Sequence, residues 1–204
     1  MQTKYKWFSI VFVFFLVLDQ VSKIWVVKNI EYRTEELEII PGIFSLVHTQ
    51  NAGAAFGIMQ GQMLIFAVFT LIAVFVLGQM IHQLPDEDRF QSFGVGLLLS
   101  GVLGNGIDRM HKQSVTDFLH FYSEHPSVEP LLVSILGSNA WPSFNVADAA
   151  IVVGMIMFGF HYLFLEKDED AEPEPTDTSL ADDLLGVADT EDAPIKSAED
   201  PQEH

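Results

Sequence analysis

Residues 62–81 read QMLIFAVFTLIAVFVLGQMI, a run without a charged side chain. An α-helix rises about 1.5 Å per residue, so about 20 apolar residues span a bilayer core of about 30 Å. This stretch therefore predicts a transmembrane helix. The stretches 7–27, 90–107 and 147–165 have similar length and apolar character. The sequence thus predicts an all-α membrane protein with four transmembrane helices.

The first of these stretches has a second interpretation. Lys4 and Lys6 precede its apolar run, as in a secretory signal peptide. An A-x-A-like cleavage site does not follow, and the apolar character continues to Val27, which favours a retained helix. Four spans place both termini on one side, and the two lysines indicate the cytoplasmic side.

Acidic and apolar residues are segregated along the chain. The 204 residues are 49% hydrophobic, yet their formal net charge is −18. Residues 166–204 hold 15 acids against 2 lysines, a net charge of −13, and residues 1–165 carry the remaining −5. We therefore expect a transmembrane domain over 1–165 and an acidic, disordered cytoplasmic tail over 166–204. The chain has neither a basic patch for nucleic acid nor a cysteine for a thiol nucleophile or metal site.

Two longer segments lie on the outward side of the predicted membrane domain, at about residues 29–60 and 110–146. The stretch 37–47 (LEIIPGIFSLV) is partly strand-like. A small β-containing platform outside the membrane is the expected result.

Charged and polar residues within the spans are informative because burying them in a bilayer is costly. Asp19 and Lys23 are four apart and share one helix face, where a structural ion pair and a functional role are both open.

The third span ends GVLGNGIDR, which places Gly101, Asn105 and Arg109 on one stripe at four-residue intervals. An arginine at a helix end can simply reach the lipid head-groups. Asn105 lies one turn before Asp108 and Arg109, and this cluster indicates a site.

Two more aspartates lie in apolar surroundings: Asp117 in SVTDFLHF and Asp148 in PSFNVADAAIVVG. Singly, Asp117 is an ordinary loop carboxylate, and Asp148 is a helix-terminus residue contributing about 0.3–1 kcal/mol. Asn145, three residues before Asp148, would share its helix face. Two carboxylates held together tend to share one proton, so one can take a proton from water while the other polarises an amide carbonyl.

Other hydrolytic chemistries lack their motifs. HExxH, GxSxG and SxxK are absent, and Ser22 points to a different helix face from Lys23. We therefore expect neither a metal nor a cofactor.

These residues resemble the lipoprotein signal peptidase family, also called signal peptidase II. The matching segments are DQVSK (19–23), NAGAAFG (51–57), GNGIDR (104–109), VTDF (115–118) and FNVAD (144–148). They occur in the family's order over roughly residues 7–165, on a frame of four spans.

The resemblance implies a bacterial inner-membrane aspartic endopeptidase that removes signal peptides from diacylglyceryl-modified prolipoproteins. It implies that Asp117 and Asp148 are the catalytic pair, near the periplasmic or outer face. It assigns substrate-binding or supporting roles to Asp19, Lys23, Asn51, Gly101, Asn105, Arg109 and Asn145. It also implies a flap over the site and inhibition by globomycin-type cyclic peptides.

Several features depart from the family pattern or leave alternatives. The segment from Asp117 to Asp148 is longer than expected, with the extra residues within 123–143. Asp108 is a third carboxylate that can replace Asp117 in the pair. A small transporter or channel subunit, with the charges of the spans along an ion path, is the alternative function, and a structural membrane partner is a third.

Overall fold

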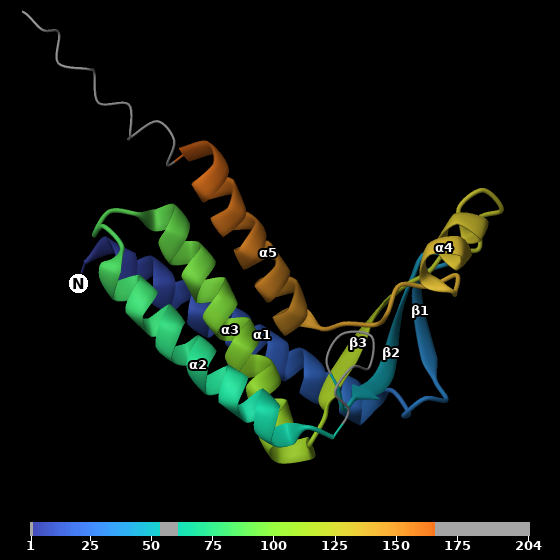
Figure 1. Cartoon of the computed structure of the whole chain (residues 1–204). Coiled ribbons are helices and arrows are strands. Elements are labelled where there is room, and N and C mark those ends of the chain that lie inside the picture. The colour runs from blue at the N-terminus through green and yellow to red at the C-terminus, as the bar shows by residue number, and fades with distance from the viewer. Residues whose placement is uncertain (1, 54–60, 166–204) are drawn as a thin grey trace, which may run out of the picture. The chain divides into compact units, whose positions relative to one another are not determined.

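The computed structural model describes residues 2–53 and 61–165, and its largest feature is a group of long helices (Figure 1). They are α1 (Thr3–Asn29), α2 (Met63–Gln83), α3 (Arg89–Lys112) and α5 (Val146–Phe160), which continues as a π-helical turn, η2 (His161–Leu165). These helices provide four candidate membrane spans by length and composition. The prediction of a four-helix membrane protein is confirmed.

Helix α3 extends further than the predicted span of 90–107. Its last turn contains Asp108 and Lys112, whose side chains pair at 3.1 Å across one helical turn. Gln113 then adopts a left-handed conformation with φ of 59° and ends the helix. The polar residues of GNGIDR therefore lie on a regular helix, as the four-residue spacing predicts.

Helix α3 is the central helix, and it packs against α1, α2 and α5. Small residues allow this close approach. A Cβ atom at Gly101 would collide with the backbone carbonyl of Ala147 on α5, and one at Gly104 would lie 2.5 Å from Asp19 Oδ2 on α1. The glycines therefore hold the first turn of α5 and the buried part of α1 close to the end of α3.

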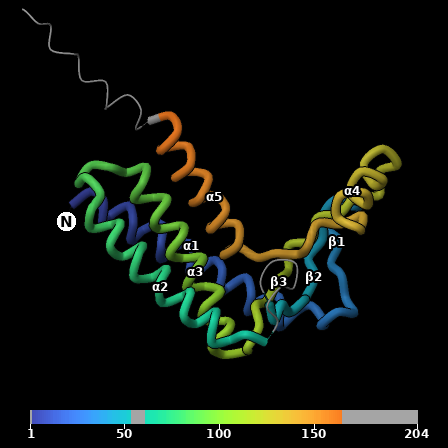
Figure 2. The backbone as a smooth tube through the Cα atoms, viewed as in Figure 1, coloured from blue at the N-terminus to red at the C-terminus, as the bar shows by residue number. Residues whose placement is uncertain are grey.

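An antiparallel sheet lies at one end of the helices, and the predicted β-containing platform is confirmed (Figure 1). Its strands are β1 (Glu36–Ile40), β2 (Phe44–Asn51) and β3 (Val115–Phe121), in the order β1-β2-β3. Thr49 on β2 pairs with Asp117 on β3. Figure 2 shows the sheet extending away from the same end at which α5 begins.

Apolar side chains fasten the sheet to the end of α1. Val26 and Ile30 are buried against Phe118 of β3. Leu46, Leu119 and Val146 pack around this cluster. The position of Asp117, beside Phe118, is thereby fixed relative to the helices.

The long segment between the two aspartates contains a short helix that the sequence analysis does not predict. Helix α4 (Glu129–Leu136) has a proline in its first turn and ends at Gly137, whose φ is 76°. It lies over the far end of the sheet (Figure 1).

Two features of the sequence analysis fall outside the described residues. They are the predicted tail, 166–204, and the part of the NAGAAFG segment at 54–57.

Candidate active site

Asp117 and Asp148 come from different elements and line the same cavity. Asp117 lies in the middle of β3, and Asp148 lies in the first turn of α5. The cavity has a volume of about 550 Å³. Its other polar residues include Asn51, Asn105 and Arg109. The structure therefore brings together five of the residues that the sequence analysis selects.

Asn145 joins the two aspartates. Its Nδ2 donates a hydrogen bond to Asp117 Oδ1 at 2.7 Å. Its Oδ1 accepts from the backbone N–H of Asp148 at 3.0 Å, and Asp148 Oδ2 accepts in return from the backbone N–H of Asn145. This reciprocal cap begins α5 and simultaneously orients both carboxylates.

Asp117 is 4% exposed, and this burial has an electrostatic consequence. Burial, followed by the nearby charge of Asp148, raises the pKa of the Asp117 carboxyl to about 7. The hydrogen bond from Asn145 opposes this rise in pKa. Asp117 can therefore hold a proton at neutral pH.

A chain of polar contacts reaches Asp148 from within the helices. Asn105 Nδ2 donates to Asp148 Oδ1 at 2.8 Å, and Asn105 Oδ1 accepts from Lys23 Nζ at 2.9 Å. Because Asn105 Oδ1 accepts a hydrogen bond from Lys23, the amide Nδ2 of Asn105 faces the carboxylate of Asp148. Lys23 thus sets the orientation of a residue that contacts Asp148.

Asp19 and Lys23 form a fully buried ion pair of 2.9 Å. Asp19 Oδ1 also accepts a hydrogen bond from the backbone N–H of Ala147, at 2.9 Å. The pair therefore contacts both α3, through Asn105, and the first turn of α5. The pair is thus a structural link between these helices, and its supporting role in the site stays a prediction.

Asp108, the third carboxylate, is engaged elsewhere. It pairs with Lys112 at 3.1 Å and with Lys23 at 3.6 Å, and it accepts from the backbone N–H of Thr116 at 3.0 Å. Among the described residues it is not part of the cavity lining. These contacts favour Asp117 over Asp108 as the partner of Asp148.

The sequence profile described as "Signal peptidase (SPase) II" matches residues 11–164. This range contains every residue that lines the cavity. It also contains the hydrogen bonds of Asn145 and the contacts of Asp19 and Lys23. The chain belongs to the signal peptidase II family.

Curated relatives agree with this family assignment. The lipoprotein signal peptidase of Maridesulfovibrio salexigens is 42% identical over 156 residues, which cover 74% of this chain and 91% of that protein. The lipoprotein signal peptidase of Geobacillus kaustophilus is 33% identical over 154 residues, covering 76% of this chain and 91% of the relative.

Solved structures also match this signal peptidase II chain. One, described as a bacterial membrane enzyme, superposes with a TM-score of 0.68 at 27% identity, covering 82% of this chain and 92% of the other. A second structure with the same description has a TM-score of 0.64, also at 27% identity.

Three of the family-matching residues contribute in other ways. Arg109 Nη2 donates to the carbonyl of Gly53 at 3.1 Å, and its guanidinium lies 4.4 Å from the ring centre of Phe66. Asn51 Oδ1 accepts from the backbone N–H of Gly53. Gly101 provides the close contact between α3 and α5 described above. Arg109 and Asn51 thus hold Gly53, just after the end of β2.

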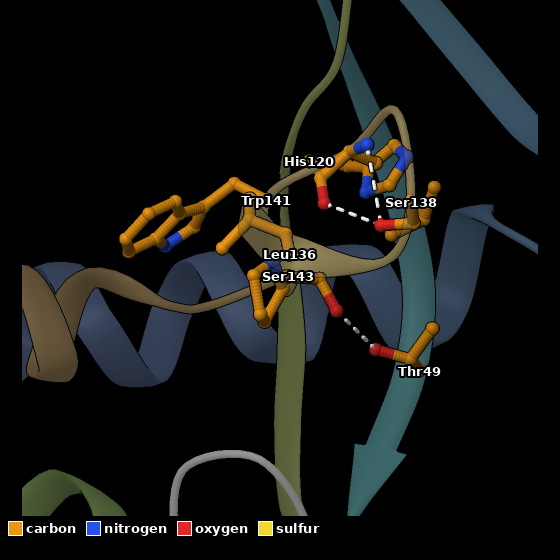
Figure 3. Close-up of a pocket in the computed structure, with 9 residues that line it drawn as sticks. Thr49, His120, Leu136, Ser138, Trp141 and Ser143 are labelled. Atoms are coloured by element: carbon orange, nitrogen blue, oxygen red, sulfur yellow. Dashed lines mark hydrogen bonds between the residues drawn. The ribbon is translucent and has the colours of Figure 1, made fainter. Parts of the chain in front are cut away.

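One wall of the cavity in this signal peptidase II member was not predicted from the sequence. Trp141, Pro142 and Ser143 line it, and they also line a neighbouring cavity with Thr49 and His120 (Figure 3). The Ser143 and Thr49 hydroxyls lie 2.9 Å apart. These residues belong to the segment that the sequence analysis flagged only for its length, and no motif marks them.

Proposed function

We propose that this protein is a membrane aspartic endopeptidase that removes signal peptides from diacylglyceryl-modified bacterial prolipoproteins. The observation that carries the proposal is the position of Asp117 and Asp148 in one cavity, with Asn145 bonded to both. Family membership supports a peptidase, and the relatives' name supports lipoprotein substrates.

The chemistry of such a pair needs one proton between two carboxylates. The ionised carboxylate takes a proton from a water molecule while the water oxygen attacks the carbonyl carbon of the scissile peptide bond. The protonated carboxyl donates a hydrogen bond to the carbonyl oxygen. The proton taken from water then passes to the amide nitrogen as the C–N bond breaks.

The hydrogen bonds favour one assignment of these roles. Asp148 accepts from Asn105 and from the backbone of Asn145, so both of its oxygens face donors. Asp117, with its pKa of about 7, is the carboxyl that holds the proton at neutral pH. Asp148 then acts as the base and Asp117 as the acid at the start of the cycle.

The apolar part of the cavity fits a substrate embedded in the bilayer. Ile151, Val152 and Val153 of α5 line it, and Val152 and Val153 are also exposed on the surface of this spanning helix. A signal helix and the lipid chains on a modified cysteine can therefore approach sideways from the bilayer. Globomycin-type cyclic peptides are expected to compete for the same cavity.

The positions of the helix ends support one orientation in the membrane. The start of α1 is tied to the α2–α3 connection, since Lys4 pairs with Asp86 at 3.1 Å and donates to the carbonyl of Leu84. This end lies opposite the sheet in Figure 1. With Lys4 and Lys6 cytoplasmic, the chain is a multi-pass inner-membrane protein with both termini inside and the site near the outer face.

The proposal is tested with protein reconstituted in lipid and two forms of one prolipoprotein, with and without the diacylglyceryl group. Cleavage of the modified form, leaving the modified cysteine at the new N-terminus, is expected, together with inhibition by globomycin. Failure of folded protein to cleave a modified substrate that a characterised signal peptidase II cleaves would contradict the proposal. Equal cleavage of both forms would remove the requirement for lipid.

A further inference from the structure

Helix α4 leaves most of its apolar surface uncovered. Leu131 is 58% exposed and Ile135 is 69% exposed, and their four-residue spacing places them on one face. Leu132 and Leu136 are partly buried, and Leu136 lines a cavity with Val47 and Thr49 of the sheet. An apolar face of this kind on a folded protein marks an interaction surface.

The charge pattern identifies the environment that suits this surface. Helix α4 begins with the charged residue Glu129, and from 130 to 147 the chain has no charged residue. The nearby edge of the sheet is acidic, because Glu36, Glu38 and Glu124 line another cavity there. The apolar helix and the charged sheet edge thus form two separate surfaces of one platform.

The chain that follows α4 returns to the membrane-facing surface of α5. Trp141, which is 50% exposed, lines the same cavity as Val152 and Val153 of α5. In Figure 3 the indole ring points away from His120 and Ser138. The sheet runs sideways from the ends of the spanning helices, and α4 lies at its far end (Figure 1).

We propose that α4 and Trp141 bind the surface of the bilayer, with Leu131 and Ile135 inserted among the phospholipids beside the site. Interfacial helices bury their apolar face about 5–10 Å into the boundary of head-groups and acyl chains. Tryptophan is enriched at this depth. The surface defined by Leu131, Ile135 and Trp141 is therefore a lipid-contact surface.

The consequence for the site rests on the proposed function. Trp141, Pro142 and Ser143 form the cavity wall, and the same segment is held against the bilayer by α4. The lipid chains of a modified substrate then pass from the leaflet into the cavity without crossing water.

The chain has no cysteine, so single cysteines can be labelled cleanly. Leu131→Cys and Ile135→Cys are each labelled with a fluorophore and reconstituted without substrate, one protein per nanodisc. The lipids carry a quencher on the shallow part of the acyl chain. Ile156→Cys, on the exposed surface of α5, is the lipid-facing control, and the exposed Glu124→Cys is the platform control.

Quenching at positions 131 and 135 is expected to be several-fold greater than at 124 and close to that at 156. Quenching at 131 and 135 as weak as at 124 overturns the proposal, because α4 then lies in water. Equal quenching at all three platform positions overturns the assignment to α4. If the environment of the labels at 131 and 135 is apolar only in nanodiscs that hold several copies of the protein, the proposal is overturned and the surface is assigned to a second copy.

The measurement is independent of peptidase activity, so failure of the proposed function leaves its result interpretable. Two labelled positions guard against a single misfolded variant. Each labelled protein is used only if its thermal unfolding matches that of the unmodified chain.

Discussion

At the scale of single residues, Asn145 has the most connected position in the site. Its side chain bonds to Asp117 and caps α5 at Asp148, so one residue determines where two carboxylates lie. The sequence indicated that Asn145 and Asp148 share the first turn of a helix. It did not indicate the contact with Asp117, because that contact joins residues 28 positions apart through the fold of β3.

Replacing this residue gives the first prediction. We expect Asn145→Ala to lower kcat/KM by about 10²-fold or more, because both members of an acid–base pair lose their orientation. Loss of the cap also costs about 0.5–2 kcal/mol of stability. Cleavage kinetics and thermal unfolding check the two effects. Asn29→Ala is the matched control, since Asn29 also bonds at a helix end but to the exposed carbonyl of Trp25. Equal activity of the two variants would contradict the role of Asn145.

The pH dependence of activity gives the second prediction. The pKa of Asp117 is raised from its ordinary value of 3.8 to about 7, so the protonated form persists through acidic and neutral pH. Activity that needs this proton is lost as the pH rises through about 7, and it is also lost at acidic pH once the base Asp148 becomes protonated. A profile of kcat/KM against pH tests this. A rate that stays constant well above neutral pH would show that the proton of Asp117 is not required.

At the scale of elements, the four spans were predictable because length and apolar character suffice for a transmembrane helix. The end of the third was not. The sequence placed Asp108 and Arg109 at the helix end and assigned residues from about 110 to an outward segment, whereas the helix continues to Lys112 with the Asp108–Lys112 pair in its last turn. Helix α4 was also missed, because it is short and its apolar residues give no burial pattern.

The packing of α3 gives the third prediction. A side chain at Gly104 would collide with Asp19 of α1, whereas Gly78 on α2 has open space around it. We expect Gly104→Val to destabilise the protein by about 1–3 kcal/mol, since overpacking forces a closely packed interface apart. Thermal unfolding in detergent measures this loss of stability. Gly78→Val is the control, and a loss as large in that variant would contradict the packing argument.

At the scale of the whole molecule, the fold brings residues that lie far apart in the chain to one end of the helices. The site takes residues from β2, α3, β3 and α5, and the sheet is attached to the end of α1 by apolar packing. The order of these motifs was visible in the sequence, but the expectation that they meet at one site came from the resemblance to a family. Physical reasoning from the sequence alone did not supply it, because the approach of β3 to α5 depends on tertiary packing.

The acidic tail gives the fourth prediction. The family profile ends at residue 164, before the segment 166–204 with its net charge of −13. We expect removal of 168–204 to leave cleavage intact, because the cavity lining lies within residues 51–153 and the Asp19–Lys23 pair that supports it precedes them. The kcat/KM of the truncated and full chains in the same lipid provides the comparison. A large loss of activity in stable truncated protein would show that the tail takes part.

The central claim is that Asp117 and Asp148 together perform the cleavage. The most direct measurement is the single-turnover rate on a diacylglyceryl-modified prolipoprotein for Asp117→Asn and Asp148→Asn. Glu87→Gln, an exposed acid in the α2–α3 connection, serves as the matched control. The account predicts that each aspartate variant folds and loses about 10²–10⁴-fold or more in rate, while the control keeps the rate of the unmodified chain. Folded Asp117→Asn or Asp148→Asn that cleaves at the unmodified rate would contradict it.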